Sequence, residues 1–196
     1  MGSFIDEFKG DNEKKSDIVV TVDGESGAGK GTIADHISKR LRIAHFSASD
    51  VFYQIAEDRG ISHVELAQQA DKQVDLEVDR RTLQRGLENN CVIDSRIASW
   101  VLGDHSDLRV YVTADLDERA KRIAGREKID FEQAKEDTEK RDEENDRRYE
   151  EYYGIDTGNL EIYDLVIDNT DMSIGKQNEL IDKALKKQFQ ERYEEQ

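Results

Sequence analysis

The sequence has a single cysteine, no long apolar run and fewer basic than acidic residues, and each of these features excludes a class of protein. Its single cysteine, Cys91, cannot form an internal disulfide, and no cluster of cysteine and histidine suggests a structural zinc site. No stretch approaches the roughly 20 apolar residues that a membrane-spanning helix needs. The N-terminus has no basic segment followed by an apolar one, so no secretory signal is visible. We therefore expect a cytoplasmic protein with no membrane partner, and we interpret Cys91 as a small core residue.

Acidic residues outnumber basic ones. The chain has 45 Asp and Glu residues against 29 Lys and Arg residues, and its formal net charge is −16 at pH 7. A broad nucleic-acid-binding surface would require a clustered excess of Lys and Arg, which this balance does not favour. The acidic surface itself indicates solubility rather than a particular activity. We expect small-molecule partners, no nucleic acid, and a monomer.

Short apolar runs alternate with amphipathic helical patterns along the chain. A typical helical pattern places Ile33, Ile37 and Leu41 four residues apart on one face. The alternation predicts an α/β fold, with a central five-stranded parallel sheet covered by helices on both faces. Residues 1–16 are polar and show no periodicity, so we expect a flexible tail followed by one domain over residues 17–196. The expected strands cover residues 18–22, 43–46, 91–94, 108–113 and 163–168.

A glycine-rich segment follows the first expected strand and has the pattern G-x-x-x-x-G-K, with a threonine two residues after the lysine. Glycines let backbone N–H groups point inward as an anion nest, and the helix that follows adds the positive end of its dipole. The lysine supplies a mobile charge for the β- and γ-phosphates of ATP, and the threonine hydroxyl a ligand for Mg²⁺. An apolar strand before the loop and an amphipathic helix after it are the context that a phosphate-binding loop, or P-loop, requires. The predicted ATP-binding residues of this loop are Gly24, Glu25, Ser26, Gly27, Ala28, Gly29, Lys30, Gly31 and Thr32.

The form Gly-Lys-Gly-Thr at residues 29–32 is typical of nucleoside monophosphate kinases. From about residue 18 to residue 185 the chain resembles the archaeal-type cytidylate kinases, which belong to that group. The resemblance implies a P-loop NTPase-type three-layer fold that transfers the terminal phosphoryl group of ATP to CMP or dCMP, with Mg²⁺. It also implies a nucleoside monophosphate (NMP)-binding region at about 48–90 and a small helical lid at about 127–153. The similar stretches are VDLEVDRR at 74–81, VIDSRIASW at 92–100, residues 148–156 and residues 162–167.

Two residues at the end of the third expected strand and just beyond it are candidates for the acceptor site. Arg96 can hold the acceptor phosphate with two hydrogen bonds and place its oxygen in line with the γ-phosphorus. Asp94 can order waters around Mg²⁺, which retains water ligands readily. A surface cation at Arg96 and a helix cap at Asp94 are the structural alternatives. Weaker acceptor-site candidates are Ser47, Asp50, Arg80 and Arg81.

Four further arginines are candidates for contacts to ATP and to the transition state. By the likeness to adenylate kinases, Arg122 would stack on adenine and Arg126 would reach the ATP phosphates. Arg141 and Arg148 lie about two helical turns apart and therefore share a helix face. On spacing alone we would interpret them as part of a solvated charged face, whereas the resemblance implies that they close over the transferring phosphoryl group.

The chain departs from the family pattern at two positions, which leaves other functions open. Tyr53 stands where the family usually has an arginine that grips the acceptor phosphate, and Ser95 where the family favours glycine. A tyrosine can donate one hydrogen bond but carries no charge. A kinase for another small acceptor, such as AMP or UMP, is therefore the first alternative. A non-catalytic ATP-dependent switch protein is the second, and it would bind ATP without acceptor-dependent release of ADP.

Overall fold

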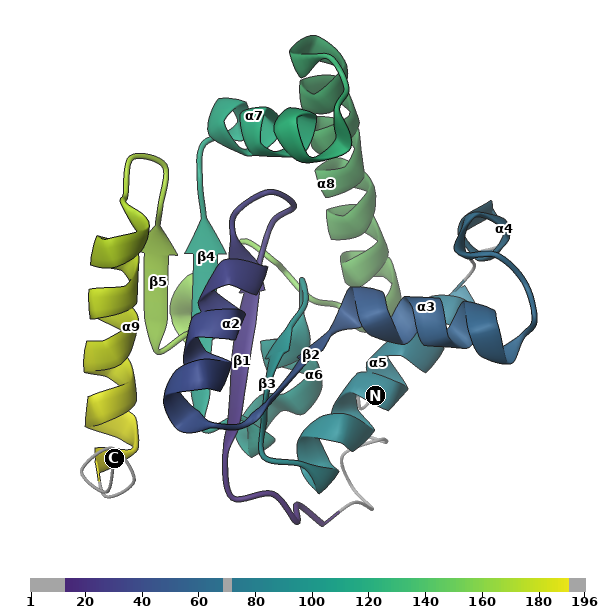
Figure 1. Cartoon of the computed structure of the whole chain (residues 1–196). Coiled ribbons are helices and arrows are strands. Elements are labelled where there is room, and N and C mark those ends of the chain that lie inside the picture. Colours follow the sequence, from purple (N-terminus) through teal and green to yellow (C-terminus); the bar gives the residue numbers. More distant parts are fainter. Residues whose placement is uncertain (1–12, 69–71, 191–196) are drawn as a thin grey trace.

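The computed structural model describes residues 13–68 and 72–190, and its centre is a five-stranded parallel sheet (Figure 1). The strand order is β2-β3-β1-β4-β5. Each strand pairs in parallel with its neighbours, and β1 lies in the middle between β3 and β4. This arrangement confirms the α/β fold that the sequence predicts. The strands are β1 (Val19–Gly24), β2 (Ala44–Ser47), β3 (Cys91–Asp94), β4 (Leu108–Thr113) and β5 (Leu165–Asp168).

Helices cover both faces of the sheet. On one face α2 and α9 pack against the strands through a core that includes Ile33, Ile37 and Ile181. On the other face α5 and α6 pack against β1 and β3 through residues such as Leu83 and Leu102. The helices are α2 (Lys30–Leu41), α3 (Ala48–Asp58), α4 (His63–Gln68), α5 (Lys72–Glu88), α6 (Ala98–Leu102), α7 (Leu116–Glu127), α8 (Phe131–Tyr153) and α9 (Ile174–Gln188), with 3₁₀ turns at Gly103–His105 and Leu160–Ile162.

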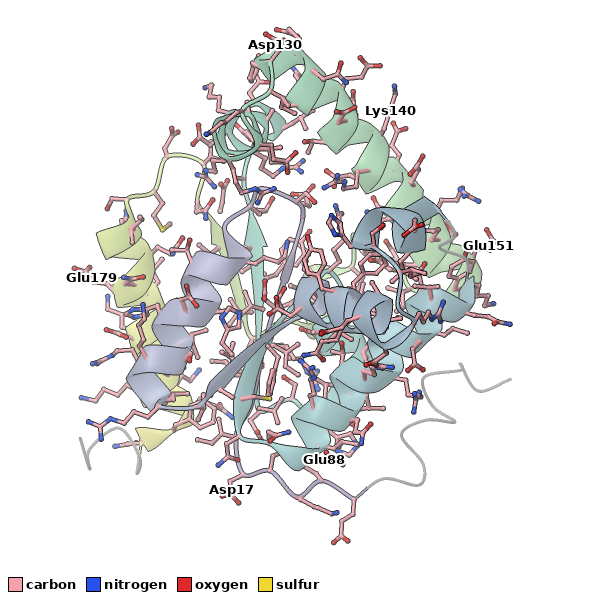
Figure 2. The ribbon with its side chains drawn as sticks, turned by 45° about the vertical axis from the view of Figure 1, so that its right-hand side comes forward. Asp17, Glu88, Asp130, Lys140, Glu151 and Glu179 are labelled. Carbon is pink, nitrogen blue, oxygen red and sulfur yellow. The ribbon has the colours of Figure 1, made fainter. Side chains whose placement is uncertain are left out.

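The long helix α8 leans over the edge of the sheet where the strands end (Figure 1). Asp130 begins it by accepting a hydrogen bond from the backbone N–H of Glu132 at 2.9 Å, and Gly154 ends it in a left-handed conformation. Lys140 and Glu151 extend from the outer side of this helix (Figure 2). Because β1 and β4 point toward α7 and α8, the loop after β1 lies beneath these two helices.

The boundaries differ from expectation mainly at the two ends of the domain. The first strand runs on to Gly24, and the fifth begins at Leu165 rather than at residue 163. Lys14 forms an ion pair with Asp107 at 2.7 Å, and the N–H groups of Lys15 and Ser16 both bond to the last turn of α5. The expected tail of residues 1–16 is therefore wrong for these residues, because they are tied to the domain. Residues 1–12 lie outside the described residues.

Within the described residues, no helix combines the length and the apolar character that crossing a membrane requires.

Candidate active site

The loop between β1 and α2 has the backbone conformation that a phosphate cradle needs. Gly24 has a φ of 146°, and a Cβ there would lie 2.0 Å from the carbonyl oxygen of Val112. Gly29 has a φ of 101° and forms the N-cap of α2, which begins at Lys30. Both positions favour glycine because L side chains rarely adopt such angles. The loop therefore brings the positive end of α2 to the exit of the central strand.

Lys30 is the first residue of α2, and its side chain turns back to the loop. Its Nζ donates a hydrogen bond to the backbone carbonyl of Glu25 at 2.8 Å. Burial, followed by the positive charge of Arg96, lowers the pKa of Lys30 to about 8, although nearby carboxylates oppose the shift. A bound phosphate chain would replace the lost hydration with negative charge. The ammonium group is therefore poised to gain a partner of the kind that the loop is built to hold.

Arg96 follows β3 and reaches across to the loop after β1. Its Nη2 donates to Oγ of Ser26 at 2.7 Å, and its Nη1 donates to Oδ1 of Asp142 at 2.9 Å. Three elements that are distant in sequence therefore meet at one guanidinium: the exit of β3, the loop after β1, and α8. The structure thus places Arg96 beside the loop, as the sequence-based hypothesis requires.

Arg119 lies beside the loop and was not among the residues predicted from the sequence. Its side chain on α7 is buried, and it donates to the carbonyl oxygens of Ala114 and Ser26 at 2.9 and 3.2 Å. It also forms ion pairs with Asp142 at 2.6 Å and with Glu25 at 3.2 Å. A signal was present, because Arg119 lies next to Ala120 on the inward, apolar face of a predicted helix. A charged residue in such a position is rare without a partner.

Arg122 and Arg126 occupy different environments on α7. Arg122 donates to the side-chain and backbone oxygens of Asn169 at 2.9 and 3.0 Å, and more weakly to the carbonyl of Ala28 at 3.3 Å. It therefore lies against the outside of the loop. Arg126 is exposed and pairs with the adjacent Glu127 at 2.8 Å. In this arrangement only Arg122 of the two contacts the loop within the described residues.

Arg141 and Arg148 also have different neighbours. Arg148 donates to Asp75 on α5 at 3.0 Å and to Asn145 at 2.6 Å. Arg141 is exposed and lines a hollow of about 240 Å³ between α7 and α8, together with Ile123 and other residues. Within the described residues neither side chain forms a hydrogen bond or ion pair with the loop, so their predicted role over the phosphoryl group needs a movement of α8.

The weaker acceptor candidates lie around α3 and α5. Ser47 caps α3 by accepting from the N–H of Ser49 at 3.2 Å, and Asp50 is exposed in its first turn. Arg80 pairs with Glu77, and Arg81 bridges Glu77 and Asp58. Tyr53 is 53% exposed and packs edge-on against His63, with 5.1 Å between the ring centres. In the part of the chain that the structure describes, none of these side chains forms a hydrogen bond or ion pair with Arg96 or with the loop.

Asp94 is held by His45, which was not among the residues that the sequence predicted for the site. Nε2 of His45 lies 3.0 Å from Oδ1 of Asp94, and Nδ1 lies 2.9 Å from Oδ1 of Asp35. The hydrogen bond to Asp94 is the main reason that the pKa of His45 is raised. His45 therefore orients the carboxylate that we expect near Mg²⁺.

Comparisons with known proteins agree with this geometry. A family model described as the cytidylate kinase-like family matches residues 19–171. The chain belongs to the cytidylate kinase-like family. A cytidylate kinase of Haloarcula marismortui is 40% identical over 153 residues, which is 76% of this chain and 80% of that protein. A cytidylate kinase of Staphylothermus marinus is 38% identical over 175 residues, 86% of this chain and 99% of that protein.

Solved structures support the fold of this family member. An uncharacterized protein from Eubacterium ventriosum superposes with a TM-score of 0.67 at 19% identity, covering 86% of this chain and 98% of that one. Shikimate kinase from Bacteroides thetaiotaomicron superposes with a TM-score of 0.57 at 13% identity, covering 88% and 98%. At such identities the likeness concerns the fold alone.

Proposed function

We propose that this protein phosphorylates CMP and dCMP with ATP, giving ADP and the corresponding diphosphate. The observation that carries the proposal is the meeting of Lys30 and Arg96 at one loop, with Arg96 bonded to Ser26 at 2.7 Å. The family membership supports the same chemistry. A cytoplasmic monomer acting in pyrimidine nucleotide metabolism fits this proposal.

The chemistry is direct transfer in line. ATP occupies the loop from Gly24 to Thr32, and Arg122 reaches the nucleotide from α7. Arg96 holds the phosphate of CMP, one oxygen of which attacks the γ-phosphorus. The bond between that phosphorus and the oxygen bridging to the β-phosphate breaks, and ADP leaves with the bonding electrons. The protein contributes positioning and charge neutralisation rather than a covalent intermediate.

Magnesium enters with ATP in this proposal. Among the described residues no three His, Cys, Asp or Glu side chains gather as a metal site of their own. Asp94 and Thr32 fit a lesser role, because Asp94 is a carboxylate close enough to influence the Lys30 charge and Thr32 supplies a hydroxyl at the end of the loop. Thr32 would contact the ion, and Asp94 would act through water.

The lid would complete the site by moving. In the proposed closed state, α8 brings Arg141 and Arg148 toward the phosphoryl group, and Arg126 approaches the ATP phosphates from α7. Closure also excludes water, which would otherwise hydrolyse ATP. Ser47, Asp50, Arg80 and Arg81 remain proposed contacts for the acceptor nucleotide.

A substrate panel tests the proposal. Wild-type protein is given Mg-ATP with CMP, dCMP, UMP or AMP, and ADP release is followed in a coupled assay. We expect CMP and dCMP to be the best acceptors by kcat/KM. An equal or better rate with AMP or UMP would overturn the choice of acceptor, and ADP release that no acceptor stimulates would indicate the switch protein instead.

A further inference from the structure

The carboxylate of Asp142 bridges two arginines beside the phosphate-binding loop. Its Oδ1 accepts from Nη1 of Arg96 at 2.9 Å, and its Oδ2 accepts from Nη1 of Arg119 at 2.6 Å. All three side chains are largely withdrawn from water, with exposed fractions of 15% for Asp142, 16% for Arg96 and 6% for Arg119. Each carboxylate oxygen therefore has a different guanidinium as its partner.

This pair of arginines is aimed at the loop as well as at Asp142. Arg96 donates to Oγ of Ser26 at 2.7 Å, and Arg119 donates to the carbonyl of the same residue at 3.2 Å. The charges of Arg96 and Asp142 are also close enough to Lys30 to influence its ionisation. Three cations, Lys30, Arg96 and Arg119, thus lie around Asp142 near the end of the central strand, where Glu25 also pairs with Arg119 and Asp94 and Asp23 also act on Lys30.

An anion held by two guanidiniums and approached by an ammonium has the surroundings that a transferring phosphoryl group requires. A carboxylate supplies two oxygens with a shared negative charge, whereas the phosphoryl group supplies three. The two cannot occupy the same place, and placing them side by side would bring like charges together away from water.

We propose that Asp142 holds the place of the transferred phosphoryl group in the substrate-free protein, and that Arg119 joins Arg96 in binding that group once Asp142 leaves. This inference rests on the proposed kinase function. Arg119 is thereby assigned as a catalytic residue. Because Asp142 belongs to α8, its displacement couples the arrival of the γ-phosphate to movement of the lid.

The opposite role for Asp142 gives a different expectation. If its carboxylate served only to hold the two arginines in their binding positions, its removal would weaken the binding of every phosphate ligand. If it competes with the γ-phosphate, its removal strengthens the binding of ATP. ADP lacks that phosphate and gains little.

The test compares Asp142→Asn with Glu143→Gln, a control that removes the same charge from the adjacent, exposed residue. Calorimetry gives the Kd of Mg-ATP and of Mg-ADP for both variants and for wild type. We expect Asp142→Asn to raise the ratio of the ADP Kd to the ATP Kd by about fivefold or more, which is the lower end of typical coupling between sites. Its thermal midpoint without ligand should fall, because the two guanidiniums lose the negative charge that they share.

An unchanged or lowered ratio in folded Asp142→Asn would overturn the inference. Should that variant fail to fold, Asp142→Glu provides the second test. It retains the competing anion, so its ratio should stay within about twofold of wild type, and a fivefold increase would contradict the inference. A wild-type protein that binds neither nucleotide would refute the proposed function itself and is thereby distinguished from failure of this inference.

Discussion

At the scale of single residues, Lys30 is the group whose chemistry the structure defines most sharply. Burial and Arg96 lower its pKa to about 8 in the protein without nucleotide. A triphosphate beside it would favour the charged form and raise that pKa again. Below pH 8 Lys30 is already mostly charged, whereas at pH 9 it is mostly neutral. Binding of ATP at the higher pH must therefore include protonation of Lys30.

We expect wild-type protein to take up about one proton when it binds Mg-ATP at pH 9. Calorimetry in two buffers of different ionisation enthalpy measures the uptake. Lys30→Arg is the matched control, because arginine stays charged at that pH and has no proton to gain. Equal uptake by both proteins, or none by wild type, would show that Lys30 is not the group that meets the phosphates.

Some residues of the candidate site could be predicted from the sequence, and others could not. Lys30 was predicted because it ends a recognisable phosphate-loop pattern. Arg96 was predicted because it closely follows a recognisable strand. Asp142, Arg119 and His45 were not, because their roles depend on contacts across the fold. In sequence Asp142 looks like one more acid on a charged helix, and nothing in its spacing indicates that it meets Arg96.

At the scale of elements, α5 lies unusually close to the layer beneath it. A Cβ on Gly86 would lie 2.5 Å from Cδ2 of Leu102 and 3.4 Å from Cδ1 of Ile93. Leu102 is 0% exposed and Ile93 is 1% exposed, so any shift of either side chain has to be accommodated inside the core. Gly86 therefore sets the distance between α5 and α6, and with it the position of the proposed NMP-binding region relative to the sheet.

We expect Gly86→Ala to lower the free energy of unfolding by about 1–3 kcal/mol through overpacking. The matched control is Gly125→Ala on α7, where an added Cβ meets nothing within 4 Å. There alanine should stabilise the protein by roughly 0.5–1 kcal/mol, because it costs less helix entropy than glycine. Denaturant titrations of both variants check this, and a neutral or stabilising Gly86→Ala would contradict the packing argument.

At the scale of the whole molecule, the alternation of strands and helices predicted the layers and the parallel sheet. The prediction succeeded because β1 and β3 are buried along their whole length and begin with short runs of mostly apolar residues. The ends of the domain were less predictable. Ser16 bonds to the carbonyl of Gly86 at 2.7 Å, and Tyr163 donates to Asp23 at 3.0 Å, so tertiary partners rather than local pattern fix both segments.

The proposed lid is a further segment whose contacts could not be predicted from the local sequence pattern. The sequence gives the length of α8 and its charged character, but the neighbours of Arg141 and Arg148 depend on how the helix lies over the sheet. Arg148 contacts α5 through Asp75, whereas Arg141 faces the hollow beside α7. Activity in this account requires the whole molecule, since donor loop, acceptor arginine and lid come from three separate parts of the chain.

The most direct test is the rate of CMP-dependent ADP formation in wild type, Lys30→Ala and Arg96→Ala, each shown to be folded by circular dichroism. Both residues are assigned to charge neutralisation at the transferring phosphoryl group. We therefore expect kcat to fall by about 10²-fold or more in each variant. Near-normal turnover in both folded variants would contradict the account.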